Sequence, residues 1–100
     1  MIIKGRYVIH NGIPKPLYIT DGWSLDDIAS VEDCDRAQAL LVKAITSLER
    51  TTKAAETMPD DVDRRWLHRA AMALQCKQAA LTEVEKIRAE LVGNPAAAAV

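Results

Sequence analysis

The densest group of side chains that could take part in binding chemistry surrounds a tryptophan in the second half of the chain. Its members are Trp66 and, around it, Arg64, Arg65, His68 and Arg69. Arginines beside an indole are a common composition of the residues that dominate binding energy at interfaces. We therefore interpret this group as a surface for an anion or an acidic partner. The alternative is that the arginines pair with the aspartates in 60–63 and stay solvated.

A second candidate surface lies in the first twenty residues. This segment carries four basic or imidazole side chains and no acid, and two tyrosines stand among them. Tyr7, Tyr18 and Lys15 are the candidate contacts, because aromatic rings between cations can stack on bases and hold phosphates. The alternative is that the cations, Lys4 and Arg6 among them, only solvate a small hairpin and protect its edge.

The sequence shows no arrangement that predicts catalysis, a metal site or a cofactor. His10 and His68 are the only histidines, and no third ligand stands at a metal-like spacing from either. Cys34 and Cys76 are far apart in the sequence, which favours reduced, structural thiols. No glycine-rich phosphate loop is present. We therefore expect a protein that is not an enzyme and that needs neither metal nor cofactor.

Length and charge narrow the classes of partner. The chain has 100 residues, 14 acidic and 13 basic, and a net charge of -1 at pH 7. This balance argues against nucleic acid as a partner. No stretch approaches the roughly 20 apolar residues of a membrane span, and no signal peptide is visible. We expect a cytoplasmic protein with one domain over 1–94 and a flexible tail over 95–100.

The first twenty residues predict a β-hairpin. Asn11-Gly12 is the dipeptide best suited to a tight hairpin turn, and β-branched and aromatic residues flank it. The expected pairing joins 2–9 with 13–19. Pro14 and Pro16 cannot donate to a strand ladder, so the second strand should be an edge strand or partly irregular.

The remaining residues predict three helices. Ser24 can cap a short helix over 24–30, with Asp27 completing a capping box. Apolar residues then recur every three or four positions over 34–57, after a start at Asp33 or Asp35, and again over 61–92. We expect Asp60-Asp61 to cap the last helix and Gly93-Asn94 to end it.

These elements define a mainly α fold of the α+β class. The expected architecture is an N-terminal β-hairpin followed by a long antiparallel helical hairpin, because two long helices joined by a short loop must run antiparallel. Their Ala and Leu seam leaves one flank of each helix uncovered, and a second protomer would cover it in a homodimer or higher oligomer. Residues 1–30 folding over that flank are the alternative. Lys77 lies within the apolar face, where its stem can cover the seam or its charge can face a ligand in an oligomer cleft.

Residues 66–81, with the sequence WLHRAAMALQCKQAAL, resemble the C-terminal helix of small accessory proteins of Mu-like transposable phages. The short N-terminal β element and the acidic LDDI turn at 25–28 are similar to that group as well. The resemblance implies a phage accessory protein without enzymatic activity. Such a protein would bind and inhibit a bacterial host protein, including an immune effector such as a CRISPR complex.

A second resemblance is to the helical-hairpin sponges with which phages capture cyclic nucleotides of CBASS or Thoeris immunity. It is carried by residues 63–67, DRRWL, followed by Leu74-Gln75 and Ala80-Leu81-Thr82. It implies oligomers with pockets between protomers, a stacking Tyr7 or Tyr18, and phosphate contacts from Lys43, Arg64 or Arg65. Cys76 departs from the pattern, because that group often has a glycine there. A structural or nucleic-acid accessory protein is a further alternative.

Overall fold

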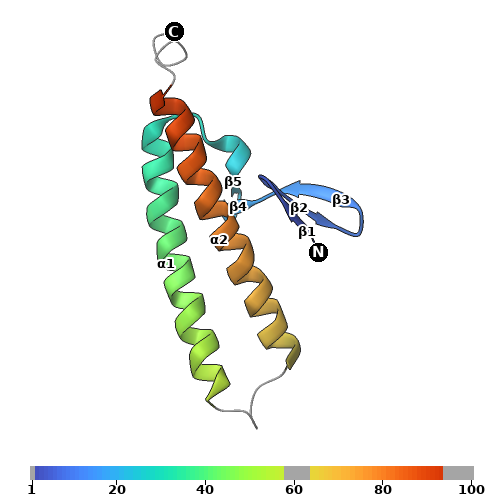
Figure 1. The fold of residues 1–100 in the computed structure, drawn as a ribbon. Helices are drawn as coiled ribbons and strands as arrows, with labels where there is room; N and C mark the ends of the chain where they lie inside the picture. Colours follow the sequence, from blue (N-terminus) through green and yellow to red (C-terminus); the bar gives the residue numbers. More distant parts are fainter. Residues whose placement is uncertain (1, 58–63, 94–100) are drawn as a thin grey trace.

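The chain begins with short strands and continues into two long helices that run antiparallel (Figure 1). The computed structural model describes residues 2–57 and 64–93. Its elements, in chain order, are β1 (Ile2–Lys4), β2 (Tyr7–His10), β3 (Ile13–Pro16), β4 (Tyr18–Thr20), β5 (Trp23–Ser24), the 3-10 helix η1 (Leu25–Asp27), α1 (Val31–Glu56) and α2 (Arg64–Gly93). This arrangement confirms the predicted α+β class and the helical hairpin.

The predicted single hairpin over 2–9 and 13–19 is wrong at both ends. Gly5, with φ +58°, turns the chain between β1 and β2, so the first expected strand is itself a hairpin. The result is a three-stranded antiparallel sheet in the order β1-β2-β3. The expected turn at Asn11-Gly12 is confirmed: both residues have positive φ, 53° and 78°, and His10 pairs with Ile13 across it.

Residues 18–20 leave that sheet and pair with β5 instead. Gly22, with φ +80°, allows the tight return between β4 and β5. Leu17 and Ile19 are almost fully buried, and this burial draws the chain away from the first sheet and onto the helices. The gain from burying apolar surface therefore outweighs continued pairing with the first strands.

The two prolines of β3 lie on an edge strand, as expected. His10 and Ile13 close a two-residue turn and so form a hydrogen-bonded pair, which makes Ile9–Pro14 and Tyr7–Pro16 non-hydrogen-bonded pairs. Both proline nitrogens therefore point to the outer edge of β3. An edge without these N–H donors cannot recruit further strands at those positions.

Helix α1 begins earlier than expected. Ser30, not Asp33 or Asp35, is the N-cap of α1: its side chain accepts a hydrogen bond from the Asp33 N–H at 3.1 Å. The Asp33 carboxylate accepts in turn from the Ala29 N–H at 3.0 Å. These bonds fix the helix start at Val31 because they satisfy backbone donors that the helix itself leaves unpaired.

The short helix over 24–30 is a single 3-10 turn over Leu25–Asp27, shorter than expected. Its predicted capping box is confirmed, since the Asp27 carboxylate accepts from the backbone N–H of Ser24 at 2.9 Å. Helix α2 is described from Arg64 to Gly93. The expected cap at Asp60-Asp61, the helix start at 61 and the tail over 95–100 lie outside the described residues.

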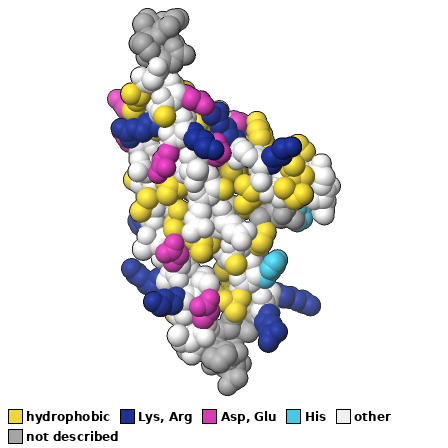
Figure 2. All heavy atoms as spheres, in the orientation of Figure 1, with side chains coloured by type: hydrophobic (Ala, Val, Ile, Leu, Met, Phe, Trp, Pro, Cys, Tyr) yellow, Lys and Arg dark blue, Asp and Glu magenta, His cyan; other side chains and the backbone are white. Residues whose placement is uncertain are grey.

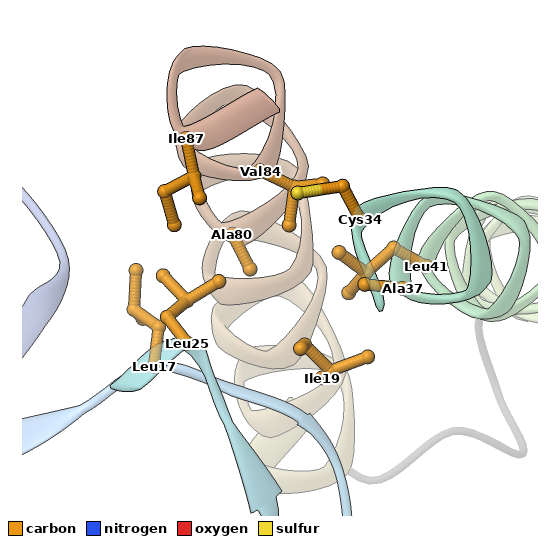
Figure 3. Packing of buried hydrophobic residues seen from close by; sticks show 9 residues of the cluster. All are labelled: Leu17, Ile19, Leu25, Cys34, Ala37, Leu41, Ala80, Val84 and Ile87. Carbon is orange, nitrogen blue, oxygen red and sulfur yellow. The ribbon is translucent and has the colours of Figure 1, made fainter. Parts of the chain in front are cut away.

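The core lies at one end of the helical hairpin. Figure 3 shows nine buried side chains: Leu17, Ile19, Leu25, Cys34, Ala37, Leu41, Ala80, Val84 and Ile87. Small residues on both helices let the backbones approach, and the apolar residues of 17–25 close over the junction. The N-terminal segment thus covers one flank of the helix pair, which was the alternative to a second protomer. Self-association itself stays a prediction.

The opposite end of the hairpin is packed more thinly. Among the described residues of α1 beyond Leu41 and of α2 before Ala80, only Ala55 and Ala70 are buried. In Figure 1 the two helices draw apart toward this end. Trp66 is 37% exposed there, and the buried hydroxyl of Thr52 has no hydrogen-bond partner among the described residues. Neither described helix is long and apolar enough to cross a membrane.

Candidate functional site

The β1–β3 sheet stands beside α2 and leaves a hollow of about 540 Å³ against it. The described residues that line this first hollow are His10 at the end of β2 and His68, Arg69 and Met72 on α2. The three helix residues share a face because positions three and four apart in a helix lie one above the other. His10 therefore meets residues of α2 that lie 58 or more positions further along the chain.

A second hollow of about 250 Å³ lies where the sheet, β4 and α2 meet. Its lining is mainly apolar and consists of Val8, Pro16, Leu17, Tyr18, Ala73, Cys76 and Lys77. Tyr18 is half exposed, so its ring is an accessible part of this wall.

The two hollows follow one another along the same pair of walls. Val8 and His10 are two residues apart in β2, so their side chains point to the same face of the sheet. Met72 and Cys76 are one turn apart on α2 and lie on the same face of the helix. We refer to the two hollows together as the sheet–helix groove.

The described lining of the sheet–helix groove is cationic and apolar. It carries the guanidinium of Arg69, the ammonium of Lys77 and the imidazoles of His10 and His68, and it includes no carboxylate. On the visible face, hydrophobic side chains follow the boundary between helices and sheet, with His and Lys or Arg side chains toward the lower end (Figure 2). Such a surface favours ligands that combine negative charge with an apolar part.

Lys77 is a structural member of the groove wall. Its ammonium donates hydrogen bonds to the backbone carbonyl oxygens of Ile19 at 2.9 Å and of Tyr18 at 3.3 Å. The Lys77 stem thus lies along the wall while its ammonium bonds to the β4 backbone, and a ligand in an oligomer cleft stays a prediction. These bonds fix β4 to α2 and so hold the Tyr18 backbone at the groove.

Ion pairs from the turn between β1 and β2 connect the first sheet to α2. The Arg6 guanidinium lies 3.1 Å from a Glu90 carboxylate oxygen and 3.8 Å from one of Glu83. The Tyr7 hydroxyl donates to the Asp26 carboxylate at 3.5 Å. Arg6 and Tyr7, from the N-terminal segment that has no acid, therefore bind carboxylates on α2 and η1. Tyr7 does not share a site with Tyr18.

The structure divides the residues that the sequence singled out. His68, Arg69 and Tyr18 line the groove. Five others do not appear among its described lining: Arg64, Arg65, Trp66, Lys15 and Tyr7. Arg65 lies one turn before Arg69 on the same face of α2, at the start of the helix and outside the described lining.

Sequence reasoning did not select His10 or Met72 as site residues. The signal for Met72 was its i, i+4 spacing from His68, which places both on one helix face. The signal for His10 was its alternation with Val8 on the strand before the Asn11-Gly12 turn. Neither pattern shows that the strand face and the helix face meet, because that depends on the position of the whole sheet.

A separate hollow of about 380 Å³ lies on α1 and is lined by Lys43, Thr46, Ser47 and Arg50. The Thr46 hydroxyl donates to the Val42 carbonyl oxygen at 2.9 Å. Lys43, a candidate phosphate contact, therefore lies on α1, which contributes no described residue to the lining of the sheet–helix groove.

Neither thiol is activated as a nucleophile. Burial raises the pKa of the Cys34 thiol above its ordinary value, and the positive charge of Arg88 offsets part of the rise. Burial likewise raises the pKa of Cys76, with a smaller opposite effect from Lys77. A raised pKa lowers the thiolate fraction, which is the reactive form. The described residues contain no cluster of three or more metal-ligand side chains.

The geometry thus defines a groove between a small sheet and one face of a long helix. Comparison of the chain with protein-family models, with curated proteins and with solved structures gives no match.

Proposed function

We propose that this chain is a non-enzymatic interaction protein that binds a bacterial host protein through the sheet–helix groove. The observation that carries the proposal is the groove lining. Side chains from β2, β4 and α2 meet on one surface that is cationic at one end, apolar at the other and free of carboxylates along its described residues. Protein interfaces combine an apolar centre with arginine and aromatic anchors in this way.

The biological setting of the proposal is a phage accessory protein that acts in the bacterial cytoplasm and inhibits a host immune effector, in the manner of an anti-CRISPR. The resemblance of residues 66–81 to accessory proteins of Mu-like phages supports this setting. The groove supports the mode of action, because its cationic and apolar lining is complementary to an acidic and apolar surface that a partner uses for its own binding.

The test is capture from a bacterial lysate with matched variants. We expect the wild-type chain to retain a host protein and the double variant His68→Glu with Arg69→Glu to lose it, because both side chains are exposed and line the first hollow. The control is Arg36→Glu, the same charge reversal at an exposed arginine on α1. The purified partner should also lose its activity when the wild-type chain is added.

Equal retention by wild type and the groove variant would contradict binding through the groove. A triple variant at Arg64, Arg65 and Trp66 separates the groove from the start of α2, since none of the three is among the described lining. If only the triple variant loses the partner, the interface is the first turn of α2 and the groove proposal is wrong.

A second candidate function is a cyclic-nucleotide sponge against CBASS or Thoeris immunity. The observation that favours it is the first hollow, whose volume of about 540 Å³ lies within the roughly 300–1,000 Å³ of small-molecule sites. Three groups that can bind phosphate line it: His10, His68 and Arg69. A sponge should melt at a higher temperature with its ligand, because a ligand of the native state stabilises it by mass action. No shift across cyclic di- and trinucleotides would reject this function.

A further inference from the structure

We infer that the sheet–helix groove recognises an extended segment of its partner that carries one acidic and one apolar side chain two residues apart. The acidic side chain occupies the first hollow and the apolar side chain occupies the second. This inference rests on the proposed function, because it specifies the partner chemistry of the same groove.

The charge of the first hollow selects the acidic side chain. Arg69 is exposed on α2 and forms no ion pair with a carboxylate among the described residues, in contrast to Arg6 and Arg88, whose guanidinium groups meet Glu90 and Asp35. His10 and His68 add further N–H donors on either side of the same hollow. A carboxylate seated there gains charge-assisted hydrogen bonds.

The second hollow selects an apolar side chain. Its walls are formed by the side chains of Val8, Leu17 and Ala73 together with the Tyr18 ring and the Cys76 thiol. The ammonium of Lys77 is engaged by the backbone carbonyl oxygens of Tyr18 and Ile19. Its charge is therefore already hydrogen-bonded within the chain, and the remaining surface is one that an aliphatic group covers well.

The spacing of the hollows selects two residues on an extended segment. Val8 and His10 mark the hollows on β2, and two residues of a strand span about 6.8 Å. On α2, the step from Met72 to Cys76 spans about 6 Å at 1.5 Å per residue. Side chains at i and i+2 of an extended segment point to one side and stand the same distance of about 6.8 Å apart.

The size of the second hollow fits one side chain of the bound segment. A sphere of the observed volume of about 250 Å³ is only about 8 Å across. A single side chain fits such a space. The extended segment therefore lies over the groove and inserts one side chain into each hollow.

The experiment measures fluorescence anisotropy with three labelled peptides of matched composition. The first contains the order Glu-Thr-Leu within a Gly, Ser and Thr host, the second replaces its Glu by Gln, and the third exchanges Thr and Leu so that Glu and Leu are adjacent. We expect the wild-type chain to bind the first peptide about tenfold more tightly than either of the others. That ratio is the scale of one charge-assisted contact.

Two protein variants assign the contact. Arg69→Gln should weaken the first peptide about tenfold and leave the Gln peptide unchanged, because the carboxylate loses its partner. Arg36→Gln, the same change at an exposed position on α1, should leave all three peptides unchanged. Circular dichroism melts of both variants confirm that the fold is retained.

Equal binding of the Glu and Gln peptides overturns the inference, as does equal weakening by Arg69→Gln and Arg36→Gln, which is the result of non-specific charge attraction. If no peptide binds while lysate capture still depends on His68 and Arg69, the groove keeps its proposed function and the extended acidic segment is wrong. If the variant at His68 and Arg69 captures the host protein as well as the wild-type chain does, the proposed function fails by itself, whatever the peptides show.

Discussion

Single side chains decide how the N-terminal strands are attached to the helices. Lys77 shows this most directly, because a charged residue in the apolar stripe of α2 gives its hydrogen bonds to the carbonyl oxygens of Tyr18 and Ile19. Its aliphatic stem fills space in the wall and its ammonium replaces water at two backbone acceptors. The sheet–helix groove thus depends on a residue that stabilises the fold.

Removing that ammonium should destabilise the chain. We expect Lys77→Met to lower the free energy of unfolding by about 1–2 kcal/mol, because the stem stays while two carbonyl oxygens lose their donor, and the bond to Ile19 is partly buried. The control is Lys86→Met, whose ammonium makes an exposed ion pair with Glu83, and which should cost less than about 0.5 kcal/mol. Urea unfolding measures both. Equal effects of the two substitutions would contradict the structural role of Lys77.

The Cys34 thiol should make stability depend on alkaline pH. Burial raises its pKa in the folded chain above the ordinary value of 9.0, so the unfolded thiol ionises first as the pH rises. The folded state then holds more protons than the unfolded state, and the free energy of unfolding falls with pH above the ordinary value. Urea midpoints at several pH values should show a smaller fall in Cys34→Ala. An identical pH dependence in both chains would show that Cys34 contributes nothing.

At the scale of elements, positive-φ residues divide the N-terminal segment into short strands. Gly5, Gly12 and Gly22 each have φ between 58° and 80°, and each stands in a turn between paired strands. The two-residue turns set the register, and this register places the nitrogens of Pro14 and Pro16 on the outer edge of β3. The same register turns Val8 and His10 to one face, where they line the groove.

Replacing a turn glycine should weaken the sheet. Gly12→Ala keeps space around the new Cβ, yet an L residue at φ +78° costs about 1–2 kcal/mol of stability. In Gly93→Ala the new Cβ meets no atom within 4 Å, and the backbone at this position needs no positive φ. The free energy of unfolding of this variant should therefore stay unchanged or rise. Thermal unfolding followed by circular dichroism compares the two. A Gly12→Ala chain as stable as wild type would contradict the turn geometry.

At the scale of the whole molecule, packing is unequal along the helical hairpin. The buried cluster joins residues 17–41 to residues 80–87, whereas the end near Glu56 and Arg64 buries only two described alanines, Ala55 and Ala70. Trp66 remains 37% exposed at that end. An exposed indole beside thinly packed helices is apolar area that a second chain could cover.

We therefore predict self-association through the end of the hairpin that carries Trp66. Light scattering should give the mass of a dimer at micromolar concentration, and Trp66→Gln should weaken the association about tenfold, because burying the rest of an indole contributes about 1–2 kcal/mol. The control is Val92→Gln, which alters an exposed apolar side chain at the other end of α2. A single-chain mass at every concentration would refute the prediction.

The sequence alone determined the features that depend on near neighbours. Asn11-Gly12 specifies its turn through backbone sterics, Ser24 and Asp27 specify a cap through a bond across three residues, and the apolar period of three and four specifies the helices. Only the tertiary structure decided that Leu17 and Ile19 leave the hairpin for the core. It also decided which of the basic residues line the sheet–helix groove together. The physical reason is that these outcomes balance strand pairing against burial between segments far apart in the chain, and no local pattern records that balance.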